Sequence, residues 1–292
     1  MRWIYHLTFA DTPVPSRYAP ASLAAEGFVH GSFRDAVRES ARLYFPADRA
    51  LALWQIDPRR LDVPVDVAVT PRGPMPHLHG AIPGDAVRAV LPLDAIDSAP
   101  DLVTGHHIAF VAFSGMTLLD LVGALDPLSR LRTMGFDPAS RCEVVSADVP
   151  TPWSQEGASL SCARVRPDLD AFDLLVLPGG LGARALAEDP AVIAWLQTFP
   201  PNRLVASVCT GALLLGAMGR LQNRRATTHA SALDQLPRWG ATPVDARVVV
   251  DGNVVTAGGV TSALDLGLHL ARALTDDATA DRIATQMAWT PR

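Results

Sequence analysis

Apolar runs and amphipathic segments alternate along the chain from residue 108 onward. Four short runs are almost continuously apolar, as expected of strands buried on both faces: 108–113, 142–147, 173–178 and 204–208. Helical periodicity follows at 117–131, at 210–219 and in two segments that begin at Val260 and at about Asp276. Asp189 followed by Pro190 marks a further helix start, and Asp251-Gly252 predicts a hairpin with a type I′ turn. The alternation predicts an α/β domain whose parallel sheet is covered by helices on both faces.

The pattern before residue 100 is different. Apolar stretches are short and separated by turn residues, and one helical period runs through 34–45 with Val37, Ala41 and Phe45 on one face. A segment rich in Pro, Asp, Ser and Gly then precedes the first strand of the α/β domain. We therefore predict a small α+β domain at 1–97, a linker at 98–105 and the α/β domain at 106–292.

Composition narrows the functions that these domains can have. The chain has 292 residues, of which 49% are hydrophobic, and a net charge of −5, so neither nucleic acid nor a membrane is an expected partner. Every positive side chain is arginine, which excludes a lysine Schiff base and the lysine of a P-loop. Three cysteines without a CxxC pair and an N-terminus without a signal peptide favour the reducing cytoplasm.

The stretch "RLVASVCTGALLLGAMG" places Cys209 between a strand and a helix. Unpaired backbone N–H groups and the positive end of the helix dipole favour a thiolate there, so we expect a lowered pKa for this cysteine. Gly179 and Gly180 end another strand, and the N–H groups of Gly180 and Thr210 are candidates for an oxyanion hole. The alternative is a buried, inert cysteine, because cysteine is among the most buried residue types.

Residues 106–290 resemble the ThiJ/PfpI superfamily, which shares a flavodoxin-like sheet with the glutamine amidotransferases. The resemblance rests on "FDLLVLPGGLGAR", "SVCTGALLLG", "RRATTH" and "VVTAGGVTSALD". Within the superfamily the segment is most similar to isonitrile hydratases and to the ligand-binding half of certain AraC-type regulators. The resemblance implies a reactive Cys209 and a homodimer. Because only about 20 residues follow the last matching segment, we expect no DNA-binding domain after it.

The superfamily places an acidic residue beside the cysteine, and Asp120 matches that position. Isonitrile hydratases have aspartate there and threonine directly after the cysteine, as Thr210 stands here, whereas proteases and many amidotransferase-like members have histidine. Ser231 stands where a glutaminase would need glutamate. His229 matches a histidine near the cysteine in much of the superfamily, although capping the next helix is an equally simple role for it.

We therefore expect Cys209, Asp120 and Thr210 to hydrate an isonitrile, a small-molecule substrate, to an N-substituted formamide. Asp120 would donate a proton and then activate water, and Thr210 would hydrogen-bond the intermediate or position the water. No cofactor and no metal are expected. Glyoxalase, deglycase or other hydrolase chemistry at the same cysteine remains an alternative, as does a non-catalytic redox or ligand sensor.

Residues 3–93 resemble a short bacterial family without an assigned function, through "IYHLT", "SLAAEGFVHGS" and "PHLHGAIPGDAV". That resemblance implies a relation to the ADP-ribosyltransferase-like fold. Four histidines fall in this domain and are candidates for one small-ligand pocket: His6, His30, His77 and His79. In an extended segment His77 and His79 would face the same way. A metal site and ordinary bonding of the rings to loop carbonyls are the alternatives.

Overall fold

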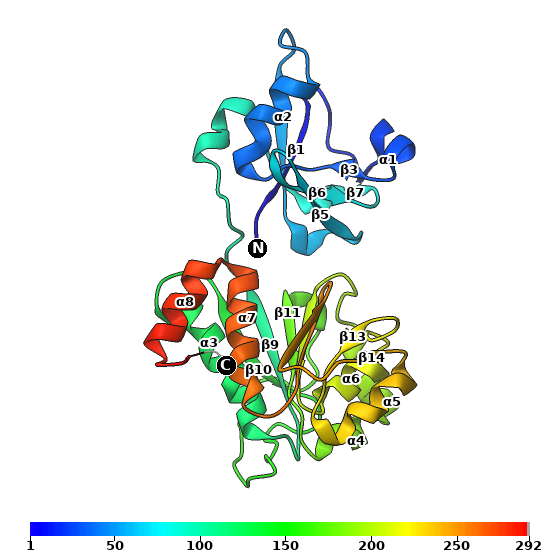
Figure 1. Cartoon of the computed structure of the whole chain (residues 1–292), viewed down its shortest axis with the longest axis vertical. Helices are drawn as coiled ribbons and strands as arrows, with labels where there is room; N and C mark the ends of the chain where they lie inside the picture. Colours follow the sequence, from blue (N-terminus) through cyan, green and yellow to red (C-terminus); the bar gives the residue numbers. More distant parts are fainter. Residues whose placement is uncertain (291–292) are drawn as a thin grey trace. The chain divides into compact units, whose positions relative to one another are not determined.

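The computed structural model describes residues 1–290 and separates the chain into two units, Met1–Val103 and Thr104–Arg292 (Figure 1). The division falls inside the predicted linker, but the start of that segment is not a free connector. The N–H of Trp3 donates to the Asp101 carbonyl at 2.9 Å, and the N–H of Val103 donates to the Met1 carbonyl at 2.9 Å. Residues 101–103 therefore run beside the N-terminus as part of the first unit.

A six-stranded sheet lies at the centre of the second unit. Its order is β10 (Arg141–Ser146), β9 (His107–Ala112), β11 (Leu174–Leu177), β12 (Leu204–Val208), β16 (Val254–Ala257) and β15 (Val248–Asp251). All neighbouring pairs are parallel except β15 with β16. In chain order the five parallel strands read 2-1-3-4-5, the flavodoxin-like arrangement. The predicted α/β fold class is thereby confirmed.

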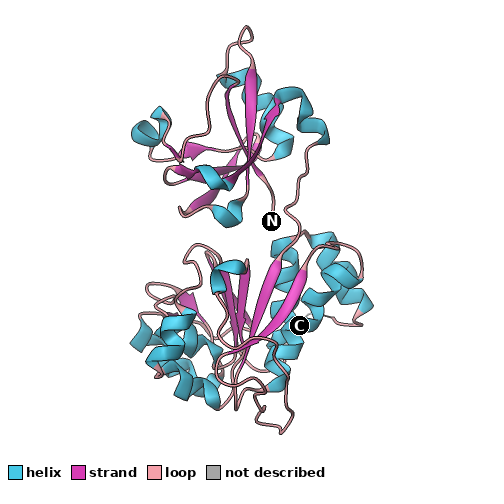
Figure 2. Ribbon diagram, turned by 180° about the vertical axis from the view of Figure 1, so that it is seen from behind, coloured by secondary structure: helices cyan, strands magenta, loops and turns pink. Residues whose placement is uncertain are grey.

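Helices cover both faces of this sheet, as Figure 2 shows. One layer contains α3 (Leu118–Thr133), α7 (Ser262–Leu274) and α8 (Asp277–Gln286), and the other contains α4 (Gly182–Ala187), α5 (Pro190–Leu196) and α6 (Gly211–Ala217). The N-cap of α5 is Asp189, whose side chain accepts the N–H groups of Ala191 and Val192. Both layers pack on one core, because the strands between them are apolar on each side.

The hairpin of β15 and β16 forms at a different position from the predicted one. Asp251 pairs with Val254, so Gly252 and Asn253 are the two turn residues. Gly252 has φ +58°, whereas Asn253 is not among the residues with positive φ. A type I′ turn needs positive φ at both central positions. The turn type is therefore wrong because Asn253 lacks the positive φ, and the predicted position is wrong because Asp251 lies within the strand ladder.

The first unit is built from small antiparallel sheets. One contains β1 (Ile4–Phe9), β4 (Leu51–Ile56) and β8 (Val87–Pro92), and another contains β3 (Val29–His30), β6 (Gly73–Leu78) and β5 (Val65–Thr70). The remaining pair joins β2 (Arg17–Tyr18) and β7 (Ile82–Pro83), and the helices are α1 (Ala21–Glu26) and α2 (Val37–Tyr44). In α2 the buried face contains Val37 and Ala41, as the periodicity predicts.

Short elements complete the described residues. They are the strands β13 (Arg225–Ala226) and β14 (Thr242–Pro243) and the 3₁₀ helices η1 (Arg34–Ala36), η2 (Pro58–Arg60), η3 (Gly84–Ala86), η4 (Leu93–Ser98), η5 (Leu169–Ala171) and η6 (Ala230–Trp239). Across residues 1–290, no helix has both the length and the apolar character needed to span a membrane.

Candidate functional site

Cys209 occupies a strained turn at the carboxyl end of β12. Its φ is +55°, in the left-handed region that residues with a side chain rarely adopt. Two hydrogen bonds hold this conformation: the Cys209 N–H donates to the Ala257 carbonyl at 2.9 Å, and the Thr228 hydroxyl donates to the Cys209 carbonyl at 2.7 Å. Strain fixed by its surroundings in this way is typical of functional positions.

Asp120 lies beside this turn although 89 positions separate it from the cysteine. It stands in the first turn of α3 and its side chain is fully buried. Oδ2 accepts the N–H of Gly179 at 3.0 Å, while Oδ1 is buried and has no nitrogen or oxygen partner among the described residues. The Cys209 thiol lies close enough to this carboxyl to act on its pKa. The structure thus brings Asp120, Gly179 and Cys209 together, and the catalytic roles expected of them stay predictions.

Burial controls the protonation of this pair. Desolvation raises the pKa of Asp120 to about 7, although the Gly179 N–H and the Cys209 thiol act in the opposite direction. Desolvation and the neighbouring Asp120 charge raise the pKa of Cys209 to about 11, against the lowering effect of the Thr210 N–H. The expected low cysteine pKa is therefore wrong. The resting site contains a neutral thiol next to a carboxyl that exchanges its proton near pH 7.

Thr210 and Gly180 are bound to each other rather than left open to a substrate. The N–H of Gly180 donates to Thr210 Oγ1 at 2.9 Å, and the Thr210 hydroxyl donates to the Gly180 carbonyl at 3.0 Å. The Gly180 N–H is therefore not an oxyanion donor, and the single hydroxyl hydrogen of Thr210 is already in use. In this structure the two residues lock the adjoining loops together, and the role of Thr210 toward an intermediate or a water stays a prediction.

Close packing, as well as hydrogen bonding, requires glycine at position 179. A Cβ atom there would lie 2.5 Å from the Thr210 nitrogen and 2.8 Å from the Cys209 Cβ, closer than atoms can approach. Only glycine lets the end of β11 reach the cysteine turn and present its N–H to Asp120. The three residues Asp120, Gly179 and Cys209 come from the segments that follow β9, β11 and β12. They therefore meet at the carboxyl edge of the sheet, where ligands bind in open parallel sheets.

Two further residues at the site escaped prediction. Thr228 directly precedes His229 in "RRATTH", and its hydroxyl fixes the cysteine turn. Glu156 accepts the N–H of Leu118 at the start of α3 at 3.1 Å, and its charge contributes to the raised pKa of Asp120. Glu156 comes from the loop between β10 and η5, where no periodic pattern indicates which side chains turn toward the site.

His229 acts as a helix cap in this structure. Its Nδ1 accepts the N–H of Ser231 at 3.2 Å and lies 2.8 Å from the Ser231 hydroxyl, at the start of η6. The capping alternative therefore describes its geometry. Its neighbour Thr228 makes the contact with the cysteine turn through its hydroxyl, and a place for the His229 ring near the cysteine stays a prediction.

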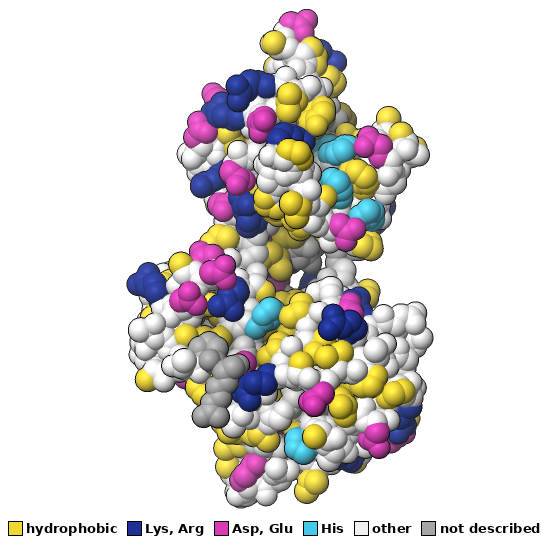
Figure 3. Space-filling model, viewed as in Figure 1, with side chains coloured by type: hydrophobic (Ala, Val, Ile, Leu, Met, Phe, Trp, Pro, Cys, Tyr) yellow, Lys and Arg dark blue, Asp and Glu magenta, His cyan; other side chains and the backbone are white. Residues whose placement is uncertain are grey.

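The four histidines of the first unit do not line one pocket. His6 and His30 border a cavity of about 590 Å³, whereas His77 and His79 do not. The His77 ring stacks on Phe28 at 3.9 Å, and His79 pairs with Asp66 at 2.9 Å. Figure 3 shows several histidines gathered on one face of this unit. Residues 1–290 contain no group of three or more His, Cys, Asp or Glu side chains that could hold a metal ion.

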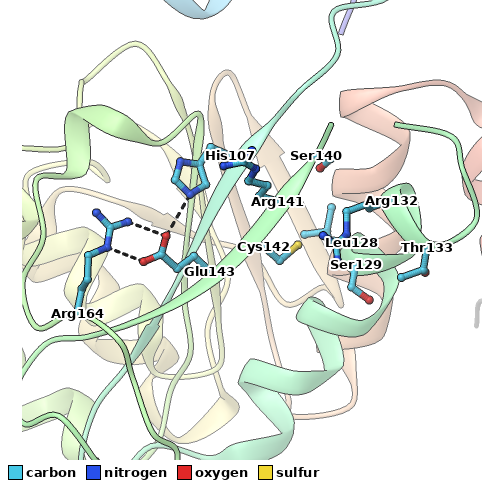
Figure 4. A pocket seen from close by; sticks show the side chains of 10 residues that line it. All are labelled: His107, Leu128, Ser129, Arg132, Thr133, Ser140, Arg141, Cys142, Glu143 and Arg164. Carbon is cyan, nitrogen blue, oxygen red and sulfur yellow. Dashed lines mark hydrogen bonds and ion pairs between the residues drawn. The ribbon is translucent and has the colours of Figure 1, made fainter. Parts of the chain in front are cut away.

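A separate hollow of about 550 Å³ lies at the edge of the second unit's sheet (Figure 4). His107 and Arg141 begin β9 and β10, so the hollow is at the amino ends of the strands, opposite to Cys209. Cys142 points toward α3, while Glu143 on the other face of β10 binds His107 and Arg164. Because this hollow straddles an edge strand far from the cysteine turn, we do not place the reaction there.

Comparisons with known proteins match each unit to a family. The model of the DJ-1/PfpI family matches residues 106–273, and that of a protein family of unknown function, DUF952, matches residues 10–90. The relation of the first unit to the ADP-ribosyltransferase-like fold is not supported by these matches.

Individual relatives cover mainly the second unit. An isonitrile hydratase from Pseudomonas putida is 38% identical over 186 residues, which are 63% of this chain and 79% of that protein. A deglycase from Thermococcus kodakarensis is 38% identical over 91 residues, 31% of this chain and 55% of that protein. The crystal structure of a ThiJ/PfpI family protein from Pseudomonas syringae matches with TM-score 0.58 and 31% identity, and covers 65% of this chain and 77% of that one.

Proposed function

Because the chain belongs to the DJ-1/PfpI family, we propose that its second unit hydrates an isonitrile to an N-substituted formamide, with Cys209 as the nucleophile. The observation that carries the proposal is the buried pair of Asp120 and Cys209. A carboxyl with a pKa of about 7, one oxygen of which has no hydrogen-bond partner among residues 1–290, is suited to accept and return a proton at the thiol. The likeness to an isonitrile hydratase supports the same chemistry.

In the first step the sulfur attacks the terminal carbon of the isonitrile. Ionised Asp120 takes the thiol proton as the S–C bond forms and passes that proton to the same carbon. The product is a thioimidate, Cys–S–CH=N–R, and Asp120 returns to its ionised state. This route does not need a thiolate at rest, which agrees with the raised pKa of Cys209.

In the second step water adds to the thioimidate carbon. Asp120 accepts a proton from the water and passes it to the nitrogen as the C–O bond forms, so that the remaining hydroxyl proton is the one that returns to the sulfur. The C–S bond then breaks, the sulfur regains its proton, and R–NH–CHO leaves. The sum is one isonitrile and one water converted to one formamide, so the reaction itself needs no cofactor. We infer that it takes place in the cytoplasm and in a homodimer.

The deglycase relative points to attack on a carbonyl as the second candidate. Such an attack places negative charge on oxygen, which backbone N–H donors usually stabilise. Here the N–H of Gly180 is bound to Thr210 and that of Gly179 to Asp120. Addition of a thiol to an isonitrile develops no oxyanion in its first step. With both glycine N–H groups engaged, the N–H of Thr210 beside the Cys209 thiol is the predicted oxyanion donor that remains, so the site supports carbonyl chemistry less than isonitrile hydration.

The test is product formation from cyclohexyl isocyanide, with methylglyoxal as the competing substrate. We expect wild-type protein to release N-cyclohexylformamide, and Cys209→Ala and Asp120→Asn to release none above background. Cys142→Ala is the matched control, since it removes a free cysteine at the opposite edge of the sheet. Equal product from Cys209→Ala, or turnover of methylglyoxal alone, would refute the proposal. Binding of the isonitrile by the wild-type protein without any turnover would instead identify a sensor.

A further inference from the structure

The cavity of the first unit is a built site rather than a surface irregularity. Its volume of about 590 Å³ lies within the common range for small-molecule pockets. Its walls come from β1, α1, α2, β3 and the turn between β5 and β6. Apolar surface is supplied by Phe9, Phe45 and Met75, while polar groups stand at two places in the wall. No part of this cavity involves the residues of the second unit.

The first polar group in the cavity wall is the ring of His6, a residue that is only 7% exposed. Its Nδ1 lies 2.8 Å from the His30 carbonyl, and since a carbonyl can only accept, Nδ1 carries the hydrogen. Burial lowers the pKa of His6, which keeps the ring neutral. Nε2 is therefore a hydrogen-bond acceptor, buried and without a partner among the described residues. A buried hydrogen-bond acceptor without a partner lowers the stability of the fold, and a donor group on a bound ligand would offset that cost.

The second polar part of the wall consists of Arg72 and the hydroxyl groups that it binds. Its guanidinium donates to the Ser40 hydroxyl at 3.0 Å and to the Tyr44 hydroxyl at 3.1 Å. The Ser32 hydroxyl also donates to Ser40, at 3.2 Å. Because Ser40 and Tyr44 accept these bonds, their own hydroxyl hydrogens remain to be donated. No carboxylate among residues 1–290 pairs with Arg72, so this wall presents hydroxyl donors and an uncompensated positive charge.

Glu26 is the one acidic side chain that borders the cavity, and it is already engaged. Its Oε2 lies 3.1 Å from the His30 Nε2. Arg72 is thus the charged side chain of this wall that has no charged partner among residues 1–290. A cationic wall with several hydroxyl donors suits an oxyanion with several acceptor atoms.

We propose that the first unit binds a small phosphate monoester that also carries a hydroxyl group. The phosphate would accept hydrogen bonds from Arg72, Ser40 and Tyr44, and the ligand hydroxyl would donate to Nε2 of His6. Full occupation of the cavity thereby requires one ligand with two groups, a phosphate for Arg72 and a hydroxyl for His6. This assignment replaces the predicted four-histidine pocket with one in which His6 is the key ring, and it does not depend on the isonitrile reaction.

The test is calorimetric titration of the full chain with glycerol 2-phosphate, with inorganic phosphate and glycerol as separate probes. We expect saturable binding of glycerol 2-phosphate, binding of phosphate that is about 10-fold weaker, and none of glycerol. Arg72→Met should weaken glycerol 2-phosphate by about 10-fold or more, because a charged hydrogen-bonding partner is lost. Arg42→Met is the matched control: it removes the same charge from an exposed position on α2 and should change nothing.

His6→Phe tests the other end, since it keeps a ring of similar size but removes Nε2. It should abolish the advantage of glycerol 2-phosphate over phosphate. If this variant does not fold, the ¹⁵N resonance of His6 Nε2 in wild-type protein serves instead, and it should move upfield as the acceptor gains a hydrogen bond. The proposal is overturned if glycerol 2-phosphate does not bind, if Arg42→Met weakens binding as much as Arg72→Met, or if that resonance stays in place.

Discussion

Asp120→Asn should make the protein more stable at neutral pH while it removes the activity. The fold raises the pKa of Asp120 from 3.8 to about 7, so the native state holds a proton that the unfolded chain releases. The contribution of Asp120 to stability therefore falls as pH rises from about 4 to about 7 and is constant above that range. Asparagine keeps the carbonyl that accepts the Gly179 N–H and has no charge to bury.

The magnitude follows from the size of the shift. A rise from 3.8 to about 7 is roughly three pKa units, and at about 1.4 kcal/mol per unit the ionised carboxylate costs at most about 4 kcal/mol. The variant should gain little at pH 4 and the full amount above pH 7. Between pH 5 and pH 8 the difference from wild type should grow by about 3 kcal/mol, since these limits span most of the titration.

Urea unfolding at pH 5 and pH 8 measures this difference. Because the chain has two units, the transition of the second is identified first as the one that Val176→Ala, a truncation in its core, shifts. Asp126→Asn is the control, because it removes an exposed carboxylate from the same helix and should change stability by less than about 0.5 kcal/mol at either pH. A difference between Asp120→Asn and wild type that does not grow with pH would refute the reasoning.

Two further outcomes follow from the same geometry, and a third follows from the family resemblance. Gly179→Ala should lower the free energy of unfolding by about 1–3 kcal/mol and remove most of the activity, because its Cβ would lie 2.5 Å from the Thr210 nitrogen. Gly259→Ala is the control and should be neutral, since a Cβ there has nothing within 4 Å. Thermal unfolding compares the two variants. Thr228→Val should cost about 1–3 kcal/mol and lower kcat, since the Cys209 carbonyl loses its hydroxyl donor, and Thr228→Ser should restore both. Light scattering on the eluting full chain should give the mass of a dimer, and a monomeric mass at micromolar concentration would contradict that prediction.

Local pattern was sufficient for most of the second unit's fold. Strand 204–208 coincides with β12, because a short apolar run between polar turns has few other structures open to it. The start of α5 was also predictable, since Asp189 caps and Pro190 begins the helix through contacts within a few residues. The hairpin turn was misplaced by one residue, because its register depends on how far the ladder of β15 and β16 extends.

The sequence by itself determined that Cys209 stands where a strand meets a helix and that Asp120 sits among apolar residues. Only the tertiary structure decided what those positions mean chemically. The carboxyl bonds to Gly179, which is 59 positions away, and burial by distant elements raises the pKa of Cys209, so that a neutral thiol stands beside Asp120 in place of the expected thiolate. In the first unit, likewise, only folding leaves Nε2 of His6 unpaired in one cavity with Arg72. Periodicity reports local conformation, whereas desolvation and hydrogen-bond partners depend on segments far apart in the chain.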